Sequence, residues 1–168
     1  MALPAVQFLA LAFAVALAAA CGPPVDLTTD IEVVELETGW YDNGVKDGRN
    51  HMLPSIAFRL RNVSDHELTS VWLTVAFWRT VDDGEMSSAQ LRGIGSEGLA
   101  PGEQTDVIVV RPDVGYTLEG PRSEFFVHSQ FVDASARVFG RHSGDIVQLG
   151  EFPIERRIIP TSSSPGGQ

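Results

Sequence analysis

The sequence contains a single cysteine, Cys21. One thiol cannot build a disulfide framework within the chain, and it cannot supply a metal site made of several cysteines. The fold must therefore be held together by burial of side chains rather than by cross-links. The position of Cys21 is also informative, because it separates an apolar N-terminus from a polar, acidic remainder.

The chain also lacks an apolar run long enough to span a membrane. The longest run, Phe8 to Ala20, is shorter than the ~20 residues that a transmembrane helix needs. Its length is typical of the apolar core of a signal peptide, and the small residues Ala18 and Ala20 suit a peptidase. Residues 1–7 hold no Lys or Arg, so the α-amine is the only positive charge there. We expect residues 1–20 to be a cleaved leader.

The residues on both sides of Cys21 form a recognisable pattern. The stretch Leu17-Ala18-Ala19-Ala20 precedes Cys21, and Gly22 follows it. This arrangement resembles the signal peptide of bacterial lipoproteins. The resemblance implies that the Cys21 thiol receives a diacylglyceryl group, whose two acyl chains suffice for stable anchoring. It also implies that no free thiolate nucleophile remains. Gly22 favours the outer membrane over the inner one, with the globular part in the periplasm or at the surface. A plain secretory leader cleaved after Ala20 is the alternative.

Positive charge is scarce in the rest of the chain. The formal net charge is −10, which argues against nucleic acid as a partner and against attachment to anionic lipid through a polybasic segment. Removing the leader leaves a chain of a size typical for one domain with its own core.

Helical periodicity is absent over any useful length, whereas alternation with a period of two recurs along the chain. The pattern predicts seven strands separated by polar turns, and the spacing favours an all-β, antiparallel, immunoglobulin-like β-sandwich with a barrel as the main rival. Residues 21–30 are expected to be a lipidated tether, residues 31–159 the sandwich, and residues 160–168 a disordered tail. The expected strands are Ile31–Glu37, Ser55–Asn62, Val71–Trp78, Ser88–Ile94, Thr105–Arg111, Phe125–Phe139 and Ile146–Ile159.

The middle of the chain carries a second resemblance. A strand from Ile56 ends at Asn62-Val63-Ser64, a long strand follows from Val71 to Phe77, and turns occur at Asp83-Gly84-Glu85 and Pro101-Gly102-Glu103. This block is similar to the FxLYD-like and related immunoglobulin-like domains of bacterial envelope proteins. The resemblance implies a fold and no catalytic residues. We interpret Asn62-Val63-Ser64 as a turn closed by the Asn62 side chain rather than as a glycosylation site.

Catalytic and metal-binding patterns are not found. No Gly-x-Ser-x-Gly elbow occurs, and His51, His66, His128 and His142 lack the spacing that places two imidazoles on one metal. The segment from Asp42 to Asn50 is rich in oxygen ligands but lacks the spacing and closing glutamate of an EF-hand. We therefore expect no enzyme activity, no metal and no cofactor.

Aromatic residues offer the remaining candidates for a partner surface. The predicted strand from Val71 to Phe77 has apolar residues on both faces, with Trp72 and Trp78 opposite the Val-Leu-Val-Phe set, while Trp40 and Tyr41 lie near a strand end. These four could form an exposed patch that docks an envelope protein; the alternative is that they are buried. The first hypothesis is a non-catalytic, lipid-anchored binding or scaffolding module. The alternatives are a ligand- or calcium-binding accessory lipoprotein and an envelope hydrolase.

Overall fold

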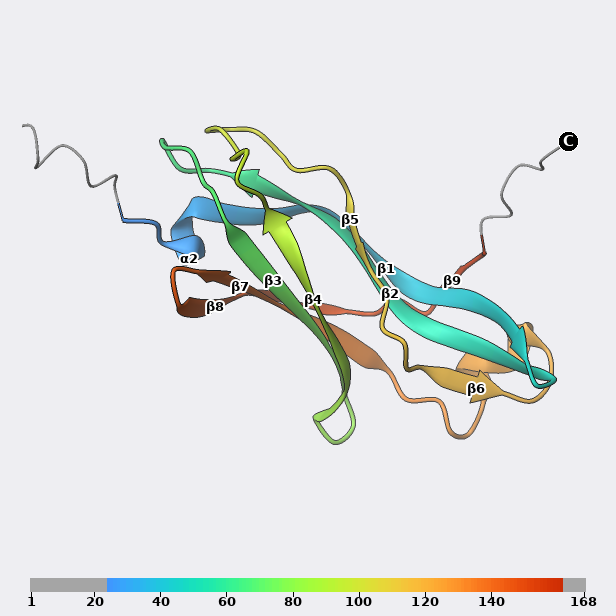
Figure 1. The fold of residues 1–168 in the computed structure, drawn as a ribbon. Helices are drawn as coiled ribbons and strands as arrows, with labels where there is room; N and C mark the ends of the chain where they lie inside the picture. The colour runs from blue at the N-terminus through green and yellow to red at the C-terminus, as the bar shows by residue number, and fades with distance from the viewer. Residues whose placement is uncertain (1–23, 162–168) are drawn as a thin grey trace, which may run out of the picture.

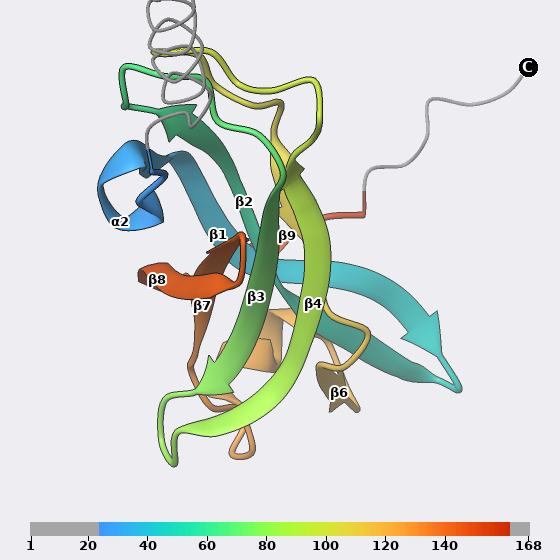
Figure 2. The same cartoon turned by 60° about the vertical axis from the view of Figure 1, so that its left-hand side comes forward.

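The computed structural model describes residues 24–161. Two β-sheets pack face to face, as Figures 1 and 2 show, so the predicted all-β sandwich is confirmed. One sheet has the strand order β5-β2-β1-β9, with β6 also paired to β2, and the other has the order β4-β3-β7-β8.

The first sheet is built on a long hairpin. Strand β1 (Ile31–Lys46) pairs with β2 (Arg49–Asn62) in antiparallel register. The turn between them is Asp47-Gly48, and both residues have positive φ, 50° and 76°. Two such residues form the tight turn that matches the twist of a hairpin. The first strand was expected to end at Glu37, with the polar segment after it outside the strands; β1 instead continues nine residues further, into the segment from Asp42 to Asn50 that was considered for calcium.

The second sheet holds the regions where the strand prediction was most accurate. Strand β3 (Val71–Arg79) forms a hairpin with β4 (Gly84–Ile94) across the predicted turn, and β7 (Ala134–His142) and β8 (Asp145–Pro153) complete the sheet. The alternation in β3 is confirmed, because its odd-numbered positions from Val71 to Phe77 are buried while Trp72 is exposed. Pro153 ends β8, which is an edge strand, in agreement with its missing N–H donor.

The chain crosses between the sheets in the immunoglobulin-like manner. A hairpin in the first sheet, β1 and β2, is followed by a hairpin in the second, β3 and β4; the chain then returns for β5 (Ile108–Val110) and crosses again for β7 and β8. Strands A, B and E of an immunoglobulin-like sandwich share one sheet in the same way, opposite C, F and G. The core between the sheets consists of buried apolar side chains from both, including Ile56, Phe58, Leu60, Val75, Phe77 and Val138.

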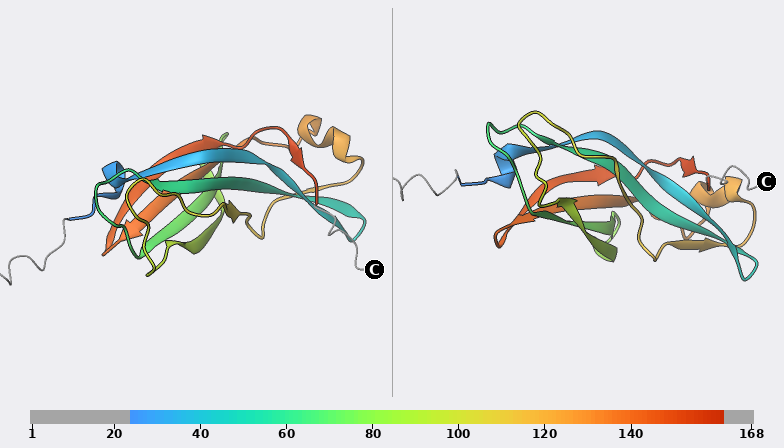
Figure 3. Two further views of the ribbon diagram at one scale, coloured as in Figure 1. Left: turned by 90° about the horizontal axis from the view of Figure 1, so that it is seen from above. Right: turned by 45° about the horizontal axis from the view of Figure 1, so that its top comes forward.

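One end of the β1–β2 hairpin extends beyond the second sheet, as Figure 3 shows. Strand β6 (Tyr116–Leu118) and the 3-10 helix η1 (Arg122–Val127) pack against this extension. The predicted strand Phe125–Phe139 was therefore wrong in its first half, and β6 was missed. The physical reason is that Phe125 and Phe131 pack around the ring of Trp40, at centroid distances of 5.2 and 5.3 Å, instead of alternating along a strand.

The other end of the sandwich holds the N-terminal segment. Residues Leu27–Asp30 form the short helix α2, capped by the Asp26 carboxylate, which accepts the N–H of Thr28 at 3.0 Å. Leu27 is buried in the core. The expected tether over residues 21–30 is therefore too long, since the chain is fixed to the domain from Leu27 onwards. At the C-terminal end, the last predicted strand divides into β8 and the short β9 (Ile158–Ile159), which pairs in parallel with β1.

Candidate functional site

The outer side of the second sheet carries an open aromatic surface. Because side chains alternate along β3, Trp72 and Thr74 point away from the core, and cross-strand pairing sets Trp72 opposite Arg141 and Thr74 opposite Phe139. Trp72 is 41% exposed and Ile146, which pairs with Arg141, is 65% exposed. The name Trp72 face is used below for the outward side chains of this region: Trp72, Thr74, Gln90, Arg92, Phe139, Arg141 and Ile146.

Two arginines on the Trp72 face have no carboxylate partner. Most arginines of residues 24–161 form ion pairs, but Arg92, Arg111 and Arg141 have no carboxylate oxygen within 4 Å. Arg111 stacks on the ring of Tyr41 at 3.8 Å. Arg92 lies over the ring of Trp72 at 5.1 Å from its centroid, and Arg141 is exposed on the neighbouring strand. Two uncompensated positive charges thus flank the exposed Trp72 in a chain of net charge −10.

A hollow of about 60 Å³ lies in the Trp72 face. Thr74 is small, whereas Trp72, two residues before it on β3, and Phe139, directly opposite it on β7, are large, and both rings line the hollow. Gln90 and Arg141 also line it. The hollow therefore combines two apolar walls with a hydroxyl, an amide and a guanidinium, a mixture that can bind a polar group attached to an apolar stem.

Trp78 shares this side of the sheet but is covered. The guanidinium of Arg137 lies over its ring at 4.4 Å and is itself paired with Asp83 at 2.5 Å and Glu151 at 3.2 Å. Of the two tryptophans considered for an exposed patch on this strand, Trp72 is exposed and Trp78 is covered. The guanidinium of Arg137, held by its ion pairs with Asp83 and Glu151, covers the ring of Trp78.

A hydrogen bond from Ser135 and the ion pair with Arg137 both act on the pKa of Glu151. Its pKa is lowered, first by the Ser135 hydroxyl, which donates to the carboxylate at 2.7 Å, and then by Arg137. Because the pKa of Glu151 is lower in the folded protein than in the unfolded chain, the ionised side chain stabilises the fold at pH values above the ordinary pKa of glutamate. This stabilisation is lost as the pH falls through the pKa of the folded state.

We expect Ser135→Ala to raise the pKa of Glu151 towards its ordinary value, because the largest contribution to its lowering is removed. The measurement is carboxyl-carbon NMR as a function of pH. Asp133 is the internal control, since its lowered pKa depends on Arg156 and should not move. An unchanged Glu151 titration would contradict the hydrogen bond.

Two of the predicted partner-binding residues lie outside the Trp72 face. Trp40 is fully buried, so the prediction that it contacts a partner was wrong; it fills the centre of the aromatic cluster with Tyr116, Phe125 and Phe131. Tyr41 is half-buried beneath Arg111. The alternative weighed for the aromatic residues, burial, is the correct one for Trp40.

The side-chain oxygens of the segment considered for calcium, residues 42–50, do not converge on one point. Asp42 is buried and pairs with Arg122 at 2.8 Å, while its other oxygen accepts the N–H of Gly44 at 2.9 Å. Asp47 lies in the tight turn at the end of the hairpin. Between residues 24 and 161, no group of three or more His, Cys, Asp or Glu side chains is placed to hold a metal ion.

His128, one of the four histidines of the chain, borders a polar hollow at the opposite end from α2, the kind of place that the hydrolase alternative would need. Glu119 lines the same hollow, but its carboxylate pairs with Arg49 at 3.2 Å. The Nδ1 of His128 accepts the N–H of Gln130 at 3.2 Å. Each group is thus engaged with a neighbour, and the hydrogen bonds of the described residues do not join the two.

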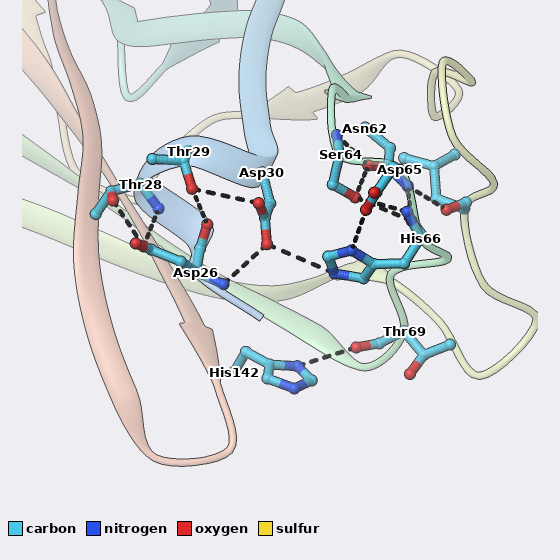
Figure 4. A network of polar contacts seen from close by, with 11 residues as sticks. Asp26, Thr28, Thr29, Asp30, Asn62, Ser64, Asp65, His66, Thr69 and His142 are labelled. Atoms are coloured by element: carbon cyan, nitrogen blue, oxygen red, sulfur yellow. Dashed lines mark hydrogen bonds and ion pairs between the residues drawn. The ribbon is translucent and has the colours of Figure 1, made fainter. Parts of the chain in front are cut away.

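A polar network lies beside α2 and is shown in Figure 4. His66 stands between two carboxylates, with Nδ1 3.3 Å from Asp65 and Nε2 3.6 Å from Asp30. Asn62, at the end of β2, is fully buried and accepts the N–H of Ser64 at 2.9 Å, which confirms the predicted turn. The ring nitrogens of His66 face carboxylates and no hydroxyl, so the network ties the N-terminal segment to the sandwich without offering a nucleophile.

Trp72 was named as a candidate from the sequence, whereas the arginines beside it were not. Arg92 and Arg141 come from β4 and β7, and nothing in the linear sequence says which of the arginines lack carboxylate partners. The alternation of β3 together with a strand order would have placed both of them next to Trp72, because the three occupy one cross-strand row. The lipidation residue, Cys21, lies outside the described residues. In the part of the chain that the structure describes, no helix is long and apolar enough to cross a membrane.

Comparison with known proteins found similarity to solved structures and no family. No family model matches the sequence, and no curated protein matches it. The chain is similar to the solved structure of a Northeast Structural Genomics Consortium target, SoR45, with 14% identity, a TM-score of 0.46, and coverage of 84% of this chain and 92% of that chain. It is also similar to AT1g01470 from Arabidopsis thaliana, with 13% identity, a TM-score of 0.38, and coverage of 79% and 83%.

Proposed function

We propose that this chain is a lipid-anchored protein of the bacterial cell envelope that acts as a non-catalytic binding or scaffolding module for another envelope protein. The observation that carries the binding role is the Trp72 face, where an exposed tryptophan, an exposed isoleucine and two uncompensated arginines share one sheet surface. A surface of this composition is typical of a protein interface, in which Trp and Arg are enriched.

The anchoring role follows from the resemblance around Cys21. Only two residues separate Cys21 from Pro24, the first described residue, and an extended chain covers ~3.3–3.6 Å per residue. Because α2 is packed on the sandwich from Leu27 onwards, a lipid at Cys21 would hold this end of the domain close to the membrane. The proposed location is the outer membrane in preference to the inner one, with the domain in the periplasm or at the surface.

We expect Cys21→Ser to abolish membrane attachment, because serine has no thiol to receive the diacylglyceryl group. The full chain is expressed in a bacterial host with lipoprotein processing, and its distribution between membrane and soluble fractions is measured together with its mass. The substitution should release the protein or leave the uncleaved precursor. Ser87→Ala, in a strand of the domain, is the matched control and should stay attached. Unchanged mass and attachment of Cys21→Ser would overturn the assignment.

A further inference from the structure

We infer that the Trp72 face binds an acidic segment of the partner protein, with a carboxylate in the hollow and an apolar side chain against the rim. This inference rests on the proposed binding role and names the chemistry of the partner. Its first support is charge. Arg92 and Arg141 lie on either side of Trp72 without carboxylates of their own, so an incoming carboxylate completes ion pairs that the domain leaves open.

The negative charge of the whole chain restricts binding of an acidic segment to the surroundings of Arg92 and Arg141. Acidic partners are repelled by a surface of net charge −10, but screening limits each charge to about 8 Å at physiological ionic strength. An acidic segment is therefore attracted only where positive charge is close and uncompensated. Arginine also suits the task, because its planar guanidinium can bind both oxygens of one carboxylate.

The hollow gives the carboxylate a place to sit. Its volume of about 60 Å³ is enough for several waters or for the end of one acidic side chain, since ~10–15 Å³ of such space holds one water. Arg141, Gln90 and Thr74 supply donors along its lining. Bound between the rings of Trp72 and Phe139, the ion pair is shielded from water, which strengthens its Coulomb attraction.

The rim supplies the apolar contact. Ile146 is exposed, lines the hollow and pairs with Arg141 across the strands, so an apolar residue adjacent to the acidic one can cover Ile146 and the exposed edge of Trp72. Access is open on the β4 side, because β4 is an edge strand of its sheet. An extended segment can therefore run over the Trp72 face without displacing any strand.

The test is site-specific photocrosslinking in the cells that make the protein. The photoreactive residue p-benzoyl-phenylalanine replaces Ile146 in the full-length, anchored chain, so that Trp72 and both arginines remain. A second chain carries it at Val109, which is 50% exposed on the other sheet. After irradiation, mass spectrometry identifies the adduct and the crosslinked segment, while membrane fractionation checks the anchor in the same cells.

We expect position 146 to capture a protein segment that contains Asp or Glu next to an apolar residue, and position 109 not to capture it. Arg141→Glu should reduce the adduct by more than tenfold, because it places a like charge opposite the incoming carboxylate. Arg49→Glu, at a paired arginine of the hairpin extension, should leave the adduct unchanged.

Four outcomes would overturn the inference: a lipid adduct, an adduct with a second copy of the chain, an adduct insensitive to Arg141→Glu, or no adduct while the protein remains anchored. Capture of a protein only at position 109 is a case of the fourth outcome: it rejects this face and leaves the binding role standing. Loss of the anchor in the fractionation would instead count against the lipoprotein assignment alone.

Discussion

Trp40→Ala is expected to lower the free energy of unfolding by about 3–5 kcal/mol, the range measured when a large buried aromatic is truncated. Trp40 is fully buried, and its ring lies 5.5 Å from that of Tyr116 and 5.3 Å from that of Phe131. Removing it leaves a cavity at the point where β1, β6 and the segment after η1 meet. The extension of the hairpin depends on this cluster, because it lies beyond the core between the sheets.

Trp40→Phe should cost much less. A phenyl ring refills most of the space, and the substitution also removes the indole N–H, which is buried and has no hydrogen-bond partner in the structure. An unpaired buried donor carries a penalty of ~1–3 kcal/mol, which phenylalanine does not carry.

Urea unfolding followed by circular dichroism measures both variants. Trp72→Ala is the matched control, since the same truncation at an exposed position should change the free energy of unfolding by no more than ~0.5 kcal/mol. A loss below 1 kcal/mol for Trp40→Ala would show that the aromatic cluster is not packed as described.

The contrast between Trp40 and Trp72 shows where sequence reasoning succeeds. Strand β3 alternates, so its two faces are evident from the residues, and the class of fold follows from several such strands. Which of the two faces meets the core depends on how the sheets pack, and this packing buries Val71 and leaves Trp72 exposed. Trp40 has no comparable signal, because the residues that bury it, Phe125 and Phe131, lie about 90 residues away in a segment without regular alternation.

The turn at Asp47-Gly48 shows a second limit. Asp-Gly between extended segments is a strong hairpin signal, but here it lies inside a run of polar residues that also fits a loop. The pairing of β1 with β2 selects the hairpin, since the register continues to Lys46 and Arg49 despite two interruptions, after Val34 and after Asp42. Asp42 changes role as a result: in a loop it would be a solvated oxygen ligand, whereas in the hairpin it is buried against Arg122.

The unpaired charge of Arg92 and Arg141 could not be predicted for a related reason. An arginine is uncompensated only if every neighbouring strand and loop fails to bring a carboxylate close, and that depends on the whole topology. Arg137 and Arg141 are four residues apart on β7 and point to the same side, but only Arg137 meets carboxylates, those of Asp83 and Glu151. The residues of the candidate site are therefore brought together by the strand pairing, and no sequence motif marks them.

Asn62→Asp should destabilise the fold by about 3–5 kcal/mol at neutral pH, comparable to leaving a buried charge without its partner. The amide of Asn62 is fully buried and its Nδ2 donates to the carbonyl oxygens of His66 at 2.8 Å and Leu99 at 2.7 Å. An aspartate of the same shape turns both donors into a negatively charged oxygen that faces two carbonyls. The side-chain link between the loop after β2 and the loop before β5 would be lost, while the backbone hydrogen bonds between Leu68 and Leu99 remain.

The destabilisation should depend on pH with a defined sign. Burial and the two carbonyl oxygens raise the pKa of the introduced carboxyl above its unfolded value, because both disfavour the charged form. The folded variant therefore binds its proton more tightly than the unfolded chain. The penalty is fully present above the folded pKa and shrinks as the pH falls through that value, since the neutral acid can donate to one carbonyl again.

Chemical denaturation at several pH values, with the wild type measured at each, isolates this effect. Asn62→Ala loses the same hydrogen bonds without a charge, so its penalty should be smaller and nearly independent of pH. Asn50→Asp is the isosteric control at an exposed hydrogen bond to the carbonyl of Gly120, and it should cost less than ~1 kcal/mol. A pH-independent loss in Asn62→Asp, or one no larger than that of Asn50→Asp, would contradict the role assigned to the buried amide.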